Sequence, residues 1–169
     1  MTARIVLKPE PLTKAAFAPF GDVIEIDAAR ARTINQGMAT RYHDLAGLDL
    51  LEAGGTPLVN IFRGKPWPLP MPIKMVERHP LSSQAFIPLS AQAFLMVVAA
   101  PAERVAPGDL RAFLARDGQG VNYHRGVWHH PLIALDRVCD FLVIDRGGPE
   151  ENCDERFFDE ADGVIELTL

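Results

Sequence analysis

The amino-acid sequence predicts an all-β protein, a barrel or sandwich of short strands that follows one short N-terminal helix. The 14 prolines and 13 glycines are spread along the whole chain of 169 residues. Proline at this frequency interrupts long helices, because it removes a backbone donor and clashes with the preceding turn. Between these turn signals the chain carries short runs rich in β-branched and aromatic residues, which suit a pleated sheet. Many short strands with frequent turns are typical of a β-barrel or sandwich.

The predicted elements follow this pattern in order. A helix is expected over 13–18, where Thr13 can cap the first backbone donors before Pro19 and Gly21 end it. The predicted strands are the runs 22–26, 57–62, 73–79, 84–89, 93–100, 110–115, 127–135 and 138–144. The sequence contains no internal repeat and no flexible linker, so we expect one domain over 1–169.

Composition and charge exclude several classes of function. Hydrophobic residues make up 48% and charged residues 23%, which is ordinary for a globular protein. A net charge of -5 gives no overall attraction to nucleic acid or to an anionic membrane. The longest apolar run, 91–101, is about half of the ~20 residues that a membrane-spanning helix needs. No secretory signal is evident, so we expect a cytoplasmic protein. Cys139 and Cys153 lack CxxC spacing, and we expect two reduced thiols, one buried and one in a loop.

Three of the five histidines fall within the segment GVNYHRGVWHHPL, at His124, His129 and His130. On a strand that begins near Val127, side chains alternate between faces, so His129 and His130 point to opposite sides. Only one of this pair can then line a given cavity. The alternative is that one ring lies in solvent while the other is a half-buried structural group.

A second segment, ERHPLSSQAF, places Glu77 and His79 two residues apart, on one face of a predicted strand, with Gln84 shortly afterwards. Two acid-base groups or metal ligands therefore converge. The alternative is a surface ion pair between Glu77 and Arg78 or a neighbouring residue.

The order of these two segments resembles the cupin barrel, whose first motif supplies HxH and then Glu, and whose second motif, PxGxxH, supplies another His. Glu77 and His79 lie where the HxH pair would be, and Gln84 lies at the Glu position. HRGVWH, which ends at His129, matches PxGxxH with His124 in place of proline. The resemblance implies a double-stranded β-helix, or jelly roll, with a metal site inside the barrel.

The implied ligands of that site are Glu77, His79, Gln84 and His129. Compared with the cupin pattern, one imidazole is replaced by a carboxylate and one carboxylate by a neutral amide. This change disfavours tight zinc binding and leaves a labile divalent ion, such as nickel or manganese, as the candidate cofactor. Whether the metal is required is open at this point.

Over nearly its full length the chain resembles the ureidoglycolate lyase family. The resemblance is carried by AFAPFGDVIE (16–25), RYHDL (41–45), ERHPLSSQAFIPL (77–89), LRAF (110–113), GVNYHRGVWHHP (120–131), DFLVIDRGG (140–148) and ENCD (151–154). It implies an enzyme of allantoin degradation that splits ureidoglycolate into glyoxylate and urea. It also implies a dimeric cupin with its active site in the barrel mouth, and exposed sheet edges agree with a homodimer.

The chemistry of that reaction selects candidate catalytic residues. Ureidoglycolate is a carbinolamide, and its cleavage requires a base for the C2 hydroxyl and an acid for the departing urea nitrogen. His79 and His129 suit proton transfer near neutral pH, and Glu77 can orient a histidine or raise its basicity. His124 completes the set of candidate catalytic residues.

The carboxylate of the substrate calls for a cation, and an arginine fork can donate two parallel hydrogen bonds to it. Arg63 and Arg146 each follow a predicted core strand and are the favoured candidates, ahead of Arg41 and Arg125. The remaining substrate-binding candidates are Tyr123, Gln84 and Asn122, although Asn122 suits a turn equally well.

Two other functions fit the same fold, because fold alone does not fix function. One is a cupin-shaped binding or sensor protein without turnover, and the other is a metal-dependent cupin oxidoreductase. Several titratable groups gathered at one barrel mouth favour the enzyme, since a simple binding pocket does not need them.

Overall fold

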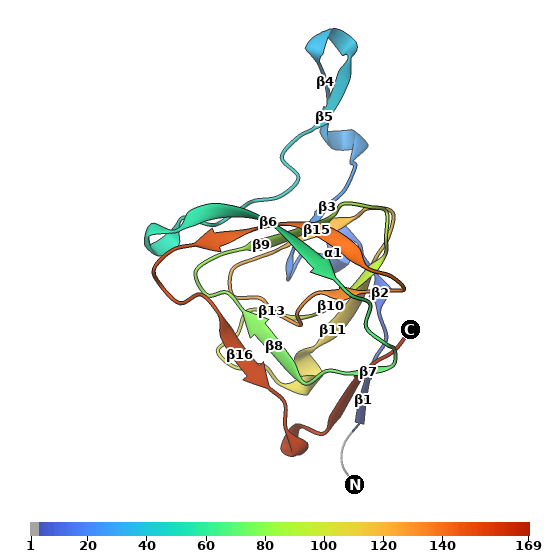
Figure 1. Cartoon of the computed structure of the whole chain (residues 1–169), viewed down its shortest axis with the longest axis vertical. Coiled ribbons are helices and arrows are strands. Elements are labelled where there is room, and N and C mark those ends of the chain that lie inside the picture. Colours follow the sequence, from blue (N-terminus) through green and yellow to red (C-terminus); the bar gives the residue numbers. More distant parts are fainter. Residues whose placement is uncertain (1–3) are drawn as a thin grey trace.

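The computed structural model describes residues 4–169, which form mainly β-strands in two large facing sheets (Figure 1). The first sheet contains, in this order, β16 (Asp154–Phe157), β8 (Met75–Arg78), β13 (Trp128–His129), β10 (Phe94–Ala99), β11 (Arg111–Ala115) and β2 (Glu10–Pro11), with β14 (Ile133–Ala134) also paired to β10. The second contains β3 (Gly21–Ile24), β12 (Gly120–Tyr123), β9 (Gln84–Pro88), β15 (Cys139–Gly147) and β6 (Thr56–Gly64). The predicted cupin-like jelly roll is confirmed.

Smaller elements complete the structure. A three-stranded sheet combines β1 (Arg4–Leu7), β17 (Val164–Leu167) and β7 (Met71–Pro72), and a separate hairpin pairs β4 (Ala31–Ile34) with β5 (Ala39–Tyr42). Short 3-10 turns are η1 (Ala28–Arg30), η2 (Asn35–Gly37), η3 (Glu52–Gly54), η4 (Pro107–Asp109) and η5 (Glu160–Asp162). The predicted helix is present as α1 (Lys14–Phe17), where Thr13 Oγ1 accepts a hydrogen bond from the backbone N–H of Ala16 at 3.2 Å.

The hydrophobic core lies on both faces of β10. Phe94, Met96 and Val98 pack between the two large sheets. Leu95 and Val97 point the other way, into a second cluster under the small sheet. All six residues of the strand are buried, which explains why the sequence here is continuously apolar and does not alternate.

One predicted strand is wrong. The run 127–135 forms two separate two-residue strands, β13 and β14, with Pro131 between them. Proline has no N–H to donate to a ladder, so the chain leaves the sheet at this residue and rejoins it afterwards. Both short strands pair with β10.

The predictions for the two cysteines are confirmed: Cys139 is a buried free thiol, and Cys153 is an exposed free thiol in the loop before β16. Within residues 4–169, no helix has the length and apolar character needed to cross a membrane.

Candidate functional site

Two antiparallel neighbours in the first sheet bring the predicted acid-base residues together. β13 pairs with β8 in a register that places His129 opposite Glu77. His79 follows the end of β8, two residues beyond Glu77, and so returns to the same face. Glu77 Oε1 lies 3.5 Å from His129 Nε2 and 4.0 Å from His79 Nε2. One carboxylate therefore faces two imidazoles from adjacent strands.

Backbone carbonyls fix the orientation of both imidazoles. Nδ1 of His79 donates to the carbonyl oxygen of Asn152 at 2.6 Å, and Nδ1 of His129 donates to that of Val127 at 3.1 Å. In a neutral imidazole this leaves a lone pair on each Nε2. His129 is only 2% exposed, and its Nε2 has no hydrogen-bond partner within residues 4–169. Since buried polar atoms are normally satisfied, this nitrogen is suited to receive a proton or a cation.

Gln84 can form a hydrogen bond with His79 in either protonation state of the imidazole. Its Oε1 lies 3.1 Å from His79 Nε2. A doubly protonated His79 donates from Nε2 to that oxygen, whereas a neutral His79 accepts from the amide NH2 when the amide is rotated. Gln84 can therefore hold the ring in place while a proton is gained or lost.

Tyr123 supports His129 from the second sheet. The two rings stack with centroids 4.5 Å apart and planes 14° from parallel. Tyr123 reaches this position because β12 pairs with β9, which sets it opposite Gln84. Burial raises the pKa of Tyr123 above its ordinary value, so the phenol stays neutral at physiological pH.

The electrostatics of the cluster favour an ionised Glu77 carboxylate beside a neutral His79. Burial lowers the pKa of His79, and the neighbouring His129 lowers it further. Burial acts to raise the pKa of Glu77, but His129 and then His79 outweigh it and hold that pKa below its ordinary value. The site thus contains proton acceptors near neutral pH.

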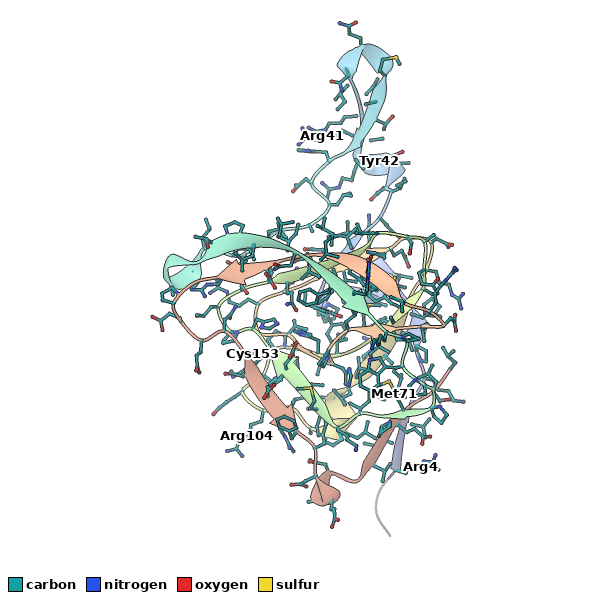
Figure 2. The ribbon with its side chains drawn as sticks, viewed as in Figure 1. Arg4, Arg41, Tyr42, Met71, Arg104 and Cys153 are labelled. Carbon is teal, nitrogen blue, oxygen red and sulfur yellow. The ribbon has the colours of Figure 1, made fainter. Side chains whose placement is uncertain are left out.

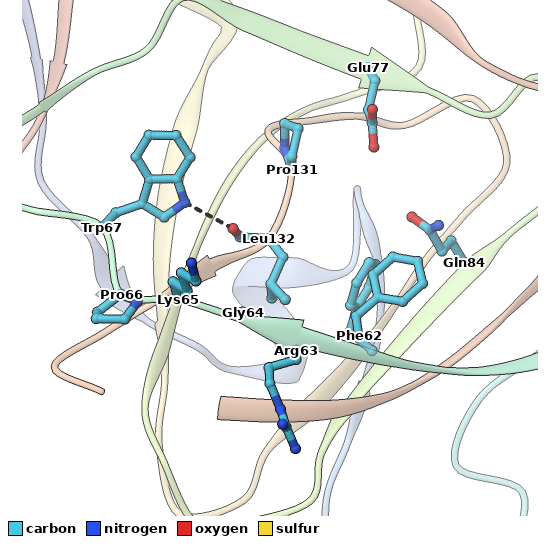
Figure 3. A pocket seen from close by; sticks show the side chains of 11 residues that line it. Phe62, Arg63, Gly64, Lys65, Pro66, Trp67, Glu77, Gln84, Pro131 and Leu132 are labelled. Carbon is cyan, nitrogen blue, oxygen red and sulfur yellow. Dashed lines mark hydrogen bonds between the residues drawn. The ribbon is translucent and has the colours of Figure 1, made fainter. Parts of the chain in front are cut away.

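A cavity of about 510 Å³ opens onto this cluster at Glu77 and Gln84 (Figure 3). Its walls are mostly apolar, and Trp67 is fixed in one wall because its indole N–H donates to the carbonyl oxygen of Leu132 at 3.2 Å. The lining residues are Phe62, Arg63, Gly64, Lys65, Pro66, Trp67, Glu77, Gln84, Phe86, Pro131 and Leu132.

The two arginines favoured by the sequence occupy different surroundings. Arg63 lies at the cavity rim but points away from Glu77 (Figure 3), and both oxygens of Asp140 accept from its guanidinium at 2.8 Å. This guanidinium holds the pKa of Asp140 below its usual range. Arg146 does not line the cavity. It is buried and donates to the carbonyl oxygens of Glu52 and Ala53, so it fastens a turn.

His124 lies away from the cluster. Its Nε2 is 3.2 Å from Asp22 Oδ2, at the edge of a different cavity of about 250 Å³. The Asn122 amide donates to the same carboxylate and to the carbonyl oxygen of Gly47, which is a structural role. The structure therefore does not join His124 to Glu77, His79 and His129.

His130 is buried beside the cavity wall, with its ring edge toward Trp67 at a centroid distance of 5.9 Å. Because β13 ends at His129, strand alternation does not govern the direction of His130.

The cluster fits a divalent cation. One ligand atom each from Glu77, His79 and His129 lies within 4.8 Å of the others, and Gln84 Oε1 is adjacent. Both imidazoles already donate from Nδ1 to carbonyl oxygens, an arrangement typical of metal-ligating histidines. The buried Nε2 of His129, which has no hydrogen-bond partner among residues 4–169, is a nitrogen ligand that such an ion would use.

Three residues of the site were not predicted from the sequence. Asn152 orients His79 through its carbonyl oxygen, and its side-chain oxygen accepts from the N–H of Leu81. Lys65 and Trp67 line the cavity beyond the end of β6. The segment ENCD signalled Asn152 only as part of a resemblance, since a backbone acceptor leaves no chemical signature in a sequence.

The chain is similar to a protein family and to several known proteins. A family model described as ureidoglycolate lyase matches residues 4–166. A ureidoglycolate lyase of Burkholderia cepacia is 54% identical over 155 residues, 92% of this chain and 88% of the relative. One of Brucella abortus biovar 1 (strain 9-941) is 56% identical over 165 residues, 96% of this chain and 95% of the relative. RmlC from Streptococcus suis, solved in complex with dTDP-D-xylose, matches 56% of this chain and 45% of its own with a TM-score of 0.40 and 10% identity. The chain belongs to the ureidoglycolate lyase family.

Proposed function

We propose that this protein is a lyase that cleaves ureidoglycolate to glyoxylate and urea. The observation that carries the proposal is the meeting of Glu77, His79 and His129 beside a cavity, in a chain of this family. The reaction moves one proton from the C2 hydroxyl oxygen to the urea nitrogen. It therefore needs groups that exchange protons near neutral pH and consumes no co-reactant.

His129, Glu77 and His79 each take one part in the proton transfer. His129 accepts the hydroxyl proton at Nε2, the buried atom that has no hydrogen-bond partner in the described part of the chain. The C2–O bond becomes a carbonyl as the C2–N bond breaks and its electron pair passes to nitrogen. Glu77 lies within 4.0 Å of both Nε2 atoms and passes the accepted proton from His129 to Nε2 of His79. His79, held by Gln84, then donates this proton to the urea nitrogen and returns to its neutral form.

Cations and polar groups around the cavity orient the substrate. Arg63 at the rim is the proposed anchor for the carboxylate, with Lys65 as a second cation on the same wall. Arg63 can turn toward the cavity only by giving up part of its contact with Asp140. Gln84 and Tyr123, which flank the two histidines, border the place of the ureido group.

In the alternative in which the two Nε2 atoms bind a metal and do not move protons, Glu77, His79, His129 and Gln84 would hold a divalent ion such as nickel or manganese. When bound, the ion would polarise the substrate oxygen and lower the pKa of the C2 hydroxyl. Two imidazoles and one carboxylate also suit iron(II) in oxygen chemistry, which supports a metal-dependent oxidoreductase as the second candidate function.

A homodimer is part of the proposal, and the exposed apolar side chains of Val59 and Ile61 on the edge strand β6 support it. The cytoplasmic location stays a prediction from the sequence.

The test is an assay of purified protein with racemic ureidoglycolate, in which urea, glyoxylate and ammonia are measured against a protein-free blank. The proposal predicts equal amounts of urea and glyoxylate with no ammonia above the blank. Parallel samples with a chelator, and with nickel or manganese restored, show whether an ion takes part. Release of ammonia would indicate a hydrolase, and absence of turnover in all samples would indicate a binding protein; either result contradicts the proposal.

A further inference from the structure

We propose that the site also cleaves ureidoglycolates whose terminal nitrogen carries an apolar substituent, such as a phenyl ring, and that it releases glyoxylate and the substituted urea. The inference rests on the proposed lyase function, because it uses the same Glu77, His79 and His129. It adds a place for the substituent, on the rings of Phe62 and Phe86, here called the aromatic wall.

The cavity is larger and more apolar than ureidoglycolate requires. Its volume of about 510 Å³ lies within the roughly 300 to 1,000 Å³ that sites for drug-sized ligands occupy. Ureidoglycolate is far smaller than a drug, and it consists of a carboxylate, a hydroxyl and a ureido group around one carbon. The aromatic, proline and leucine side chains of the cavity have no apolar counterpart in it. Space and apolar surface therefore remain when ureidoglycolate is bound.

The cavity extends from Glu77 in one main direction. On the side of β16, Cys153 Sγ lies 3.9 Å from Glu77 Oε2 (Figure 2), and Cys153 does not line the cavity. The lining residues lie on the other side of the carboxylate, toward Phe62 and Trp67 (Figure 3). A substrate larger than ureidoglycolate therefore extends toward the aromatic wall.

The strands of the second sheet place the aromatic wall beside Gln84. On β6, Phe62 pairs with the buried Phe141 of β15, so its ring points to the inner face of the sheet. On β9, Phe86 lies two residues beyond Gln84, so these two side chains share a face. The rings of Phe62 and Phe86 meet edge to face with centroids 5.8 Å apart. The wall is thus continuous with the polar end of the cavity.

Two aromatic side chains of the cavity are left uncovered by the chain itself. Phe62 is 38% exposed and Trp67 is 45% exposed, although both line the cavity. Figure 3 shows them on opposite sides of Leu132, whose carbonyl oxygen accepts from the Trp67 indole N–H. Burial of apolar surface favours binding, and ligand sites are mostly lined by such side chains. An apolar group between these rings would cover surface that ureidoglycolate leaves in water.

The proposed binding mode directs the substituent to this wall. Gln84 and Tyr123 border the ureido group, and the ring of Phe86 lies 5.9 Å from that of Tyr123. A group on the terminal nitrogen therefore continues from Tyr123 across Phe86 to Phe62. The terminal nitrogen is the one that is not bonded to C2. The carboxylate and the C2 hydroxyl consequently keep their places.

The bonds that change are the same with and without the substituent. The proton of the C2 hydroxyl passes to the nitrogen bonded to C2, and the C2–O bond becomes a carbonyl. The C2–N bond breaks and its electron pair passes to nitrogen. The products are glyoxylate and the substituted urea, and no co-reactant is consumed.

The first experiment measures binding without turnover, by calorimetric titration of phenylurea and of urea. Phenylurea should bind the wild type at least roughly tenfold more tightly, the scale of discrimination that apolar pockets reach. Phe62→Ala should remove most of this preference. The matched control is Phe157→Ala on β16, which replaces a ring that is 61% exposed outside the cavity and should keep the preference. Equal affinity for the two ureas, or a full preference in Phe62→Ala, overturns the role of the aromatic wall.

The second experiment compares kcat/KM for racemic ureidoglycolate and for its derivative with phenyl on the terminal nitrogen, with glyoxylate measured for both. The wild type should cleave the derivative with a kcat/KM at least equal to that for ureidoglycolate. The ratio of the two values should fall roughly tenfold in Phe62→Ala and stay at the wild-type value in Phe157→Ala. Cleavage of ureidoglycolate alone overturns the further activity and leaves the lyase proposal standing. Cleavage of neither compound contradicts the lyase proposal, and the further activity is overturned with it.

Discussion

Two buried histidines, His79 and His130, make the stability of the protein depend on pH. Burial lowers the pKa of His79 and His130 from the unfolded value of 6.5. Below pH 6.5 the unfolded chain therefore binds more protons than the folded one, so the stabilising contribution is full above this pH and is lost as the pH falls toward the folded values. Glu77, with its pKa lowered from 4.5, adds a further loss at lower pH.

The measurement is the melting temperature between about pH 8 and about pH 5, the range in which histidine titrates. We expect it to fall as the pH drops below 6.5, and to fall less steeply in His79→Gln. A melting temperature that is constant over this range, or that rises on acidification, would contradict the lowered pKa values of these histidines.

The residues of the site differ in how well the sequence predicts them. The two-residue period of a strand pairs Glu77 with His79, the cupin order of motifs adds His129, and the structure brings all three together. His124 lies in a motif and Arg146 lies near a strand end, but neither side chain reaches the cluster. A side chain in a loop or at a strand end can face either way, so its direction depends on tertiary contacts that a motif does not encode.

At the scale of elements, local pattern predicted the strands that carry the core and missed those that depend on distant partners. The apolar runs that became β6, β9, β10 and β15 were predicted within a few residues of their ends. β1 and β17 pair in parallel from opposite ends of the chain, and no local pattern reports such a pairing. The hairpin of β4 and β5 was also not predicted, because its residues are neither alternating nor strongly apolar.

The pairing of β6 with β15 places Arg63 opposite Asp140. This contact yields a prediction about how the substrate carboxylate is bound. Arg63→Ala should raise KM roughly ten- to more than a hundredfold, if a charge-assisted contact is equally strong in ground and transition states. Asp140→Asn should lower KM, since it weakens the contact that holds Arg63 outside the cavity. Arg146→Ala is the matched control and should reduce thermal stability without changing KM. An unchanged KM in Arg63→Ala would refute the assignment of the anchor.

For the whole molecule, the packing of β10 predicts one cooperative unit. This strand contributes Phe94, Met96 and Val98 to one core cluster and Leu95 and Val97 to the other, so neither cluster can be lost alone. We therefore expect a single calorimetric transition for the chain, with equal van't Hoff and calorimetric enthalpies per cooperative unit. Two separate transitions would indicate two domains and contradict the single domain predicted from the sequence.

Urea release from ureidoglycolate by His129→Gln, compared with His79→Gln, His124→Gln and the wild type, tests the proposed catalytic centre. Loss of acid-base help typically slows turnover by ~10²- to 10⁴-fold, and this loss is expected for His129→Gln and His79→Gln. His124→Gln should keep turnover near that of the wild type, because its ring lies at a different cavity. Wild-type turnover in both His129→Gln and His79→Gln, with folding verified by circular dichroism, would contradict the assignment of Glu77, His79 and His129 as the catalytic centre.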